Sequence, residues 1–138
     1  RTALRGGELL LCVRGSTGVI SIAAAELLGA NVTRGIVPIR FDEARVLQNF
    51  GYHLMTAGLV QGQIREKTYG TALMQINIGD LRKVDVSFHS INAQARIAAA
   101  HDVMAEETRR LESIYQRKLA ALDELKQSLL HQAFSGAL

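Results

Sequence analysis

Apolar residues in the first part of the chain occur in short runs that glycine-rich turns separate. Two runs, Glu8–Arg14 and Val19–Ile22, flank the segment Gly15-Ser16-Thr17-Gly18, and this pattern predicts a β-hairpin. A third β-rich run covers residues 32–41, and Pro38 within it favours an edge strand or a bulge. The pattern therefore predicts a short-stranded sheet.

Helical spacing replaces this pattern in the middle of the chain. Asp42 can cap a helix that starts near Glu43, and apolar residues follow at roughly helical intervals as far as Ile64. Gly58 predicts a break near Ala57, because glycine weakens a helix. Shorter elements complete the prediction: a helical turn or an extended run at 23–28, a loop at 69–71, a helical turn at 80–82 and a last strand at 84–88. The fold class is therefore α+β, with a small mixed-sheet lobe.

The rest of the chain predicts one long helix, because residues 92–135 contain neither glycine nor proline. Ser90 or Asn92 can cap its start. His101, Thr108 and Lys118 depart from an otherwise apolar heptad pattern, which is typical of a coiled coil. The apolar residues of this helix-packing face are Ile97, Met104, Leu111, Tyr115, Leu122, Leu125 and Leu129.

The length of this helix indicates that it needs a partner. A helix over residues 92–133 would be about 60 Å long, whereas a globule of about 90 residues is about 25 Å across. We therefore expect the helix to extend past its own domain, and its apolar face to pack on a second copy, another segment of a longer chain, or another protein. A helical hairpin is the alternative, although no glycine or proline marks a turn. The predicted domains are 1–91 and 92–138.

Composition narrows the class of protein. The chain has 138 residues, of which 48% are hydrophobic, so it can bury a core. Its single cysteine, Cys12, cannot form an internal disulfide, which favours a reducing cytoplasm, and no apolar run has the length of a membrane span. Residues 1–91 hold ten Lys and Arg against seven Asp and Glu, whereas residues 92–138 hold six of each. The net charge of +3 therefore lies in the first part, which is compatible with nucleic-acid binding.

Sequence motifs of common enzyme sites are absent. The chain has no Gly-x-x-x-x-Gly-Lys-Ser/Thr loop, no Gly-x-Gly-x-x-Gly and no Gly-x-Ser-x-Gly segment. Its four histidines form no pair with metal-ligand spacing, and one cysteine cannot build a zinc site. A single proline also excludes the Pro-Pro-aromatic motif of amino-group methyltransferases. These observations predict a non-catalytic binding or scaffolding protein without a cofactor or metal of its own.

Cations and hydroxyls of the first part are the candidates for DNA contacts. Arginine and lysine contact phosphates and guanine edges, and hydroxyls contact either backbone or bases. The segment 65–71 combines two cations, two threonines and a tyrosine, and is the strongest candidate. The predicted DNA-binding residues are Arg14, Ser16, Thr17, Arg34, Arg65, Lys67, Tyr69 and Thr71, with Arg40, Arg82 and Lys83 as further cations nearby. Ordinary surface charge is the alternative for each.

The C-terminal run resembles the tail of type I restriction–modification specificity (S) subunits. Leu125–Leu130 reads Leu-Lys-Gln-Ser-Leu-Leu and Gln132–Leu138 reads Gln-Ala-Phe-Ser-Gly-Ala-Leu, as that tail does. Upstream, Ile91–Ile97 is similar to the Glu-Gln-x-x-Ile entry of the family's conserved helix. Ala93 replaces the usual glutamate there, and the usual Pro-Pro before it is missing.

Segments before the helix are similar to a target recognition domain of that family. Gly7–Leu10 and Gly15–Gly18 resemble its Gly-Asp-Ile-Leu and Gly-Ser-x-Gly elements, and residues 70–81 fit the run before its last strand. The resemblance implies the C-terminal piece of an S subunit, with a partial recognition domain at 1–91 and one conserved helix at 92–138. Complete subunits of the family have two recognition domains spaced by two antiparallel helices.

The resemblance also implies a function. An S subunit reads one half of a bipartite DNA site with each recognition domain and docks the modification (methyltransferase) and restriction subunits. S-adenosylmethionine, ATP and Mg are therefore expected only on partner subunits. For the isolated chain we expect an antiparallel homodimer through the helix, in the cytoplasm and without membrane contact. The alternative hypothesis is a protein–protein adaptor that acts through its long coiled-coil helix.

Overall fold

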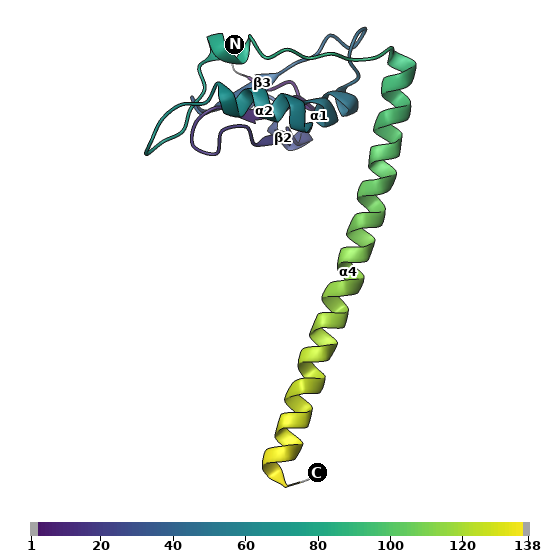
Figure 1. Ribbon diagram of the computed structural model, residues 1–138. Coiled ribbons are helices and arrows are strands. Elements are labelled where there is room, and N and C mark those ends of the chain that lie inside the picture. The colour runs from purple at the N-terminus through teal and green to yellow at the C-terminus, as the bar shows by residue number, and fades with distance from the viewer. Residues whose placement is uncertain (1–2, 137–138) are drawn as a thin grey trace. The chain divides into compact units, whose positions relative to one another are not determined.

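The computed structural model describes residues 3–136, and its chain divides after Ala98 into two compact units. We call the first unit the lobe and residues 99–136 the distal segment. The last helix, α4 (Ile91–Ser135), begins in the lobe and continues through the distal segment (Figure 1). The other elements all belong to the lobe: β1 (Leu9–Cys12), β2 (Ile20–Ile22), the 3-10 helix η1 (Ala25–Leu27), β3 (Ile36–Ile39), α1 (Gln48–Thr56), α2 (Gly58–Glu66) and α3 (Ile78–Leu81).

The lobe is built on a three-stranded antiparallel sheet with the strand order β2-β1-β3. Leu10 of the central strand lies opposite Ser21 of β2 and Pro38 of β3. Pro38 thus occupies an edge strand, where its missing N–H group removes no ladder bond. The predicted hairpin, the edge position of Pro38 and the α+β class are confirmed. The mixed sheet is corrected, because the described strands pair only in antiparallel fashion.

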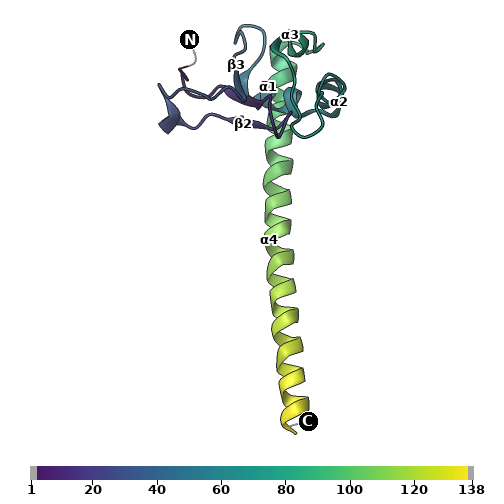
Figure 2. The same ribbon diagram turned by 90° about the vertical axis from the view of Figure 1, so that its left-hand side faces the viewer.

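Helices α1 and α2 pack against the sheet to form the main core (Figures 1 and 2). Leu9 and Leu11 alternate toward this face of β1 and are fully buried, as the period of two in a strand requires. Met55, Val60 and Ile64 cover them from the two helices. The sheet therefore holds both helices in place through one face of its central strand.

The predicted helix break is confirmed, but the predicted start near Glu43 is wrong. Ala57 is extended (ψ 143°) and separates α1 from α2. Asp42 accepts hydrogen bonds from the backbone N–H groups of residues 44–46, which closes only one turn. Leu47 is extended again (ψ 139°), and its N–H donates to the side chain of Gln94 and not to the carbonyl of Glu43. The helix therefore begins at Gln48.

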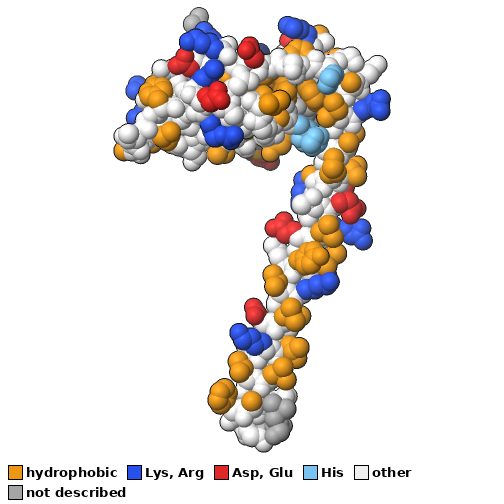
Figure 3. All heavy atoms as spheres, in the orientation of Figure 1, with side chains coloured by type: hydrophobic (Ala, Val, Ile, Leu, Met, Phe, Trp, Pro, Cys, Tyr) orange, Lys and Arg blue, Asp and Glu red, His pale blue; other side chains and the backbone are white. Residues whose placement is uncertain are grey.

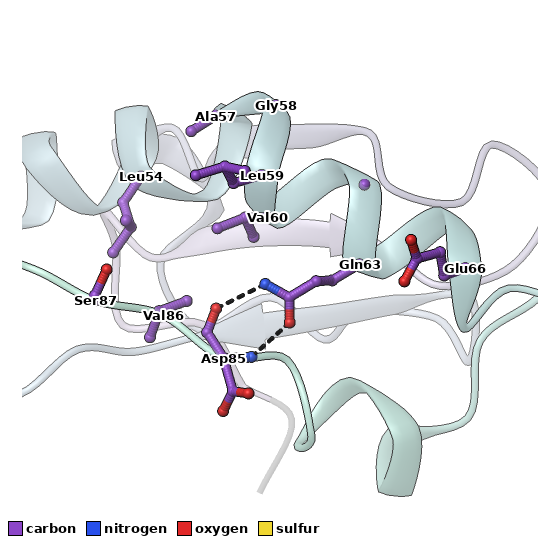
Figure 4. Close-up of a pocket in the computed structure, with 11 residues that line it drawn as sticks. Leu54, Ala57, Gly58, Leu59, Val60, Gln63, Glu66, Asp85, Val86 and Ser87 are labelled. Carbon is purple, nitrogen blue, oxygen red and sulfur yellow. Dashed lines mark hydrogen bonds between the residues drawn. The ribbon is translucent and has the colours of Figure 1, made fainter.

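The strand predicted at 84–88 is also wrong, because a side chain takes the place of a neighbouring strand. The Gln63 amide pairs with both backbone groups of Asp85: Gln63 Nε2 donates to the Asp85 carbonyl (2.9 Å), and the Asp85 N–H donates to Gln63 Oε1 (2.8 Å). Figure 4 shows this pair beside a shallow hollow of about 470 Å³ that α2 and residues 85–87 line. The segment is thus extended, but it joins no sheet.

The first turns of α4 belong to the lobe. Ala98 is buried against Val46 and Phe50, with Ile97 half-buried beside them. Gln94 is fully buried, and its amide contacts three backbone groups of the lobe. Ile97, which was predicted to lie on the helix-packing face, therefore packs within the lobe.

The distal segment is one uninterrupted helix as far as Ser135, which excludes the hairpin alternative. Its predicted apolar residues are all at least 48% exposed: Met104, Leu111, Tyr115, Leu122, Leu125 and Leu129. Figure 3 shows hydrophobic side chains along the whole visible length of the helix. The predicted tail motif extends past the described part, since Ala137 and Leu138 lie outside residues 3–136.

Candidate nucleic-acid interface

Three chain segments lie side by side beyond one end of the sheet. Gln75 forms antiparallel bridges with Arg14 on one side and with Tyr69 on the other. The Gly15 N–H and the Thr17 hydroxyl both donate to the Met74 carbonyl, at 2.8 and 3.1 Å. The predicted turn after β1 and the predicted loop after α2 are therefore joined, although 57 positions separate Thr17 from Met74.

A fourth segment joins them through the residue that follows Arg34. The Val13 N–H donates to the carbonyl of Gly35 at 2.8 Å, next to the position where Arg14 leaves the sheet. Residues 14–17, 34–35 and 67–77 therefore form one surface, which we call the loop cluster. It contains most of the positively charged and hydroxyl-bearing residues predicted to contact DNA.

The structure places these residues as follows. Arg14, Ser16, Arg34, Arg65, Tyr69 and Thr71 are exposed, whereas Thr17 and Lys67 are half-buried. Arg65 lies in the last turn of α2, and its carbonyl accepts the Thr68 N–H. Arg14, Thr17 and Tyr69 share the hydrogen-bonded arrangement around residues 74–75. Ser16, Arg65 and Thr71 are exposed beside this arrangement, and their side chains form no hydrogen bond or ion pair with it.

Arg40 was one of the further cations, and it forms an ion pair with a buried carboxylate. Its Nη2 lies 2.9 Å from Oε1 of Glu8, which is only 5% exposed. Burial raises the pKa of Glu8, but hydrogen bonds from the Arg5 backbone N–H and from Arg40 outweigh burial and hold the pKa below its usual value. Arg40 therefore balances a buried carboxylate, which gives it a structural role that the exposed arginines of the loop cluster lack.

A polar chain lies behind Tyr69. Its members Asn77 and Asp80 were not predicted as site residues, and Lys83 was named only as a further cation. Tyr69 Oη donates to Oδ1 of Asn77 (2.7 Å), and Lys83 Nζ donates to Oδ1 of Asp80 (2.8 Å). The Lys83 ammonium lowers the pKa of Asp80, and the Asn77 side chain and the charge of Lys67 act in the same direction. The i, i+3 spacing of Asp80 and Lys83 was the available signal for the ion pair. No local signal links Tyr69 to Asn77.

The described part of the chain has neither a metal-ligand cluster nor a membrane-spanning helix. Within residues 3–136, no group of three or more His, Cys, Asp and Glu side chains could hold a metal ion. None of the helices in that range combines the length and the apolar character that crossing a membrane requires.

Comparison with known proteins supports the resemblance predicted from the sequence. No family model matches the chain. It is 23% identical over all 138 residues to the type I restriction enzyme EcoBI specificity subunit of Escherichia coli. The chain resembles type I specificity subunits. It spans 29% of the EcoBI subunit's length.

Solved structures of specificity subunits have the same fold. The S subunit of a type I restriction–modification system from M. genitalium superposes with a TM-score of 0.65 at 23% identity, over 82% of this chain and 29% of that one. The HsdS subunit from Thermoanaerobacter tengcongensis gives a TM-score of 0.68 at 21% identity, over 95% of this chain and 33% of that one. The lobe and the long helix are thus a fold known from S subunits.

Proposed function

We propose that the chain is a DNA-recognition part of a type I restriction–modification complex. The observation that carries the proposal is the loop cluster, in which three hydrogen-bonded segments present Arg14, Tyr69 and nearby cations on one exposed surface. Similarity to specificity subunits along the whole chain supports it. The lobe would read one half of a bipartite site, and it would itself catalyse no reaction.

The chemistry of the loop cluster suits double-stranded DNA. Arg14 and Arg34 of the loop cluster, and Arg65 at the adjoining end of α2, are exposed cations that can bind phosphates and set the register of the protein on the duplex. Hydroxyl and aromatic side chains such as Tyr69 and Thr71 lie next to them and can reach base edges. In this proposal the modification and restriction subunits dock on the chain, and S-adenosylmethionine, ATP and Mg act on those subunits.

The first prediction concerns phosphate binding. Replacing Arg65 or Lys67 with alanine should weaken DNA binding at low salt and lower the dependence of log K on log salt by about 0.9 for each lost phosphate contact. Fluorescence anisotropy of a labelled duplex over a salt series measures both. Arg109→Ala removes an exposed cation of the distal helix and should leave the slope unchanged. A chain that binds no duplex at low salt would contradict the proposed function.

We also propose that the distal helix pairs with the same helix of a second copy, in antiparallel orientation. Its six predicted apolar residues are at least 48% exposed, and the heptad positions from Leu111 onward are apolar except at Lys118. An isologous pair is closed, because the same face serves both copies. Such a dimer would carry two lobes that read two half-sites.

The second prediction tests this dimer. Replacing Leu122, Leu125 and Leu129 together with glutamate removes six buried leucines from each dimer, at about 2 kcal/mol apiece. The triple variant should sediment as a monomer at tens of micromolar protein, whereas the wild type sediments as a dimer. Glutamate at the outward positions Gln116 and Gln127 is the matched control and should preserve the dimer. A folded, helical wild-type monomer would overturn the pairing.

The same exposed face supports a second candidate function, a protein–protein adaptor that acts through α4 alone. The two candidates differ in their dependence on the lobe. Loss of DNA binding in the Arg65 and Lys67 variants favours the recognition subunit. The adaptor is favoured if the wild-type chain binds no DNA and if α4 still binds another protein after those substitutions.

A further inference from the structure

Tyr69 is held at a fixed place on the loop cluster. Its backbone N–H donates to the Gln75 carbonyl (2.9 Å), and the Gln75 N–H donates back to the Tyr69 carbonyl (2.8 Å). The residue is 43% exposed, so Tyr69 reaches the surface of the lobe although its backbone is anchored. The backbone pairing and the hydroxyl bond to Asn77 together fix the position of the phenol.

The polar chain behind Tyr69 sets the direction of each of its hydrogen bonds. Lys83 can only donate, so its partner Asp80 is an accepting carboxylate. Asn77 lowers the pKa of that carboxyl as well, which agrees with an amide that presents its NH2 group to Asp80. The carbonyl oxygen of Asn77 lies 2.7 Å from the Tyr69 hydroxyl and, as an amide oxygen, can only accept.

The position of Asn77 in the helix gives an independent indication of the same orientation. It occupies the N-cap position of α3, where an asparagine oxygen commonly accepts from the N–H groups of the first turn. No such capping bond is present at this position. The oxygen is used instead by the Tyr69 hydroxyl at 2.7 Å, so the single phenolic proton of Tyr69 is committed to Asn77.

We propose that Tyr69 is a base-reading residue whose hydroxyl oxygen accepts a hydrogen bond from the exocyclic amino group of adenine or cytosine in the major groove. This inference rests on the proposed function in DNA recognition. With its proton donated to Asn77, the phenol has only a lone pair to offer a base. Adenine N6 and cytosine N4 are the donors that base pairs present in the major groove, whereas guanine and thymine present acceptors there.

The width of the loop cluster favours the major groove. Residues 14, 75 and 69 stand on three adjacent backbones, which at about 4.8 Å between neighbours span about 10 Å before side chains are counted. The minor groove of B-DNA is about 6 Å wide and the major groove about 12 Å. The three segments together are wider than the minor groove, which favours contact with the major groove.

The experiment compares base preferences of Tyr69→Phe and the wild type. The full chain is incubated at low salt with a pool of randomised duplexes, and the bound DNA is sequenced. The wild type should show one position that favours adenine or cytosine over guanine and thymine. Tyr69→Phe should lower that preference about 2- to 10-fold, as expected for one neutral hydrogen bond. Binding to the preferred duplexes should weaken accordingly, whereas the salt slope should stay the same because no phosphate contact is lost. Tyr52→Phe makes the same chemical change in α1 and should alter none of these.

A second variant separates hydrogen-bond direction from loop structure. Asn77→Leu frees the phenolic proton, so Tyr69 can donate or accept, and the preference at that position should disappear although the tyrosine remains. An unchanged base preference in both variants, or a wild-type preference for guanine or thymine at the position that Tyr69→Phe alters, overturns the inference and leaves the proposed function intact. A wild type that binds no duplex of the pool overturns the proposed function itself.

Discussion

Replacing Gln94 with leucine should lower the free energy of unfolding by about 3 kcal/mol. The Gln94 side chain is fully buried; its Oε1 accepts from the Leu47 N–H (2.9 Å), and its Nε2 donates to the carbonyls of Arg45 (2.8 Å) and His89 (2.7 Å). Leucine has a similar size but leaves all three backbone groups without these partners. Each buried polar group that loses its partner costs about 1–3 kcal/mol, which exceeds what leucine regains through apolar burial.

Urea unfolding followed by circular dichroism measures this change. Gln127→Leu is the matched control, because it makes the same replacement at an exposed position of the same helix, and it should change the unfolding free energy by less than about 0.5 kcal/mol. Gln94→Glu should also destabilise the lobe, because a carboxylate cannot donate to the two carbonyls. Equal stability of Gln94→Leu and wild type would mean that the buried amide does not hold the start of α4.

Gly70→Ala should lower stability by about 2 kcal/mol and disrupt the loop cluster, with a loss of DNA binding. Gly70 has φ +121°, a region that residues with a side chain rarely adopt, and a Cβ there would lie 2.3 Å from the Leu73 carbonyl oxygen. The obstacle is backbone, so it cannot move without opening the loop that pairs Tyr69 with Gln75. Binding of a labelled duplex and thermal unfolding report the two effects.

Gly62→Ala is the control for this prediction, and it should have the opposite sign. Gly62 lies within α2, and a Cβ at this position meets nothing within 4 Å. Alanine favours a helix over glycine by about 1 kcal/mol, so the unfolding free energy should rise while DNA binding stays the same. A Gly70→Ala protein with wild-type stability and binding would show that the loop tolerates another backbone conformation.

Elements that depend on local sequence were predictable. The Gly15–Gly18 turn between two apolar runs gave the hairpin, and Gly58 marked the helix break. The absence of glycine and proline from 92–135 predicted α4, which spans Ile91–Ser135. In each case the residues that decide the structure are neighbours in the chain.

Elements that depend on a distant side chain were not predictable. Residues 43–47 have helical composition, but Gln94, 47 positions away, takes the N–H of Leu47. Residues 84–88 have the composition of a strand, but Gln63 occupies the backbone groups of Asp85. A side-chain amide that bonds to backbone groups leaves no pattern in the sequence of the segment that it contacts. Composition therefore predicted a helix at 43–47 and a strand at 84–88, and both predictions were wrong.

The candidate site was predictable as a set of residue types but not as an arrangement. Cations and hydroxyls after β1 and α2 were evident, whereas the hydrogen bond that joins Thr17 to Met74 spans 57 positions. Charge alone also ranked Arg40 with the exposed arginines, because nothing near it in the sequence reveals that it pairs with Glu8. The residue that a cation pairs with therefore decides its role. Arg40 pairs with a buried carboxylate, which the sequence alone does not reveal.

The polar chain from Lys83 to Tyr69 has a consequence for how recognition could diverge among related proteins. The direction of the Tyr69 hydrogen bond is set by Asn77, whose oxygen accepts the phenolic proton. A substitution at Asn77 could reverse the hydrogen-bonding role of Tyr69 without altering the tyrosine itself. Two relatives with identical contact residues could then prefer different bases, and their specificity would diverge through residues that never touch DNA.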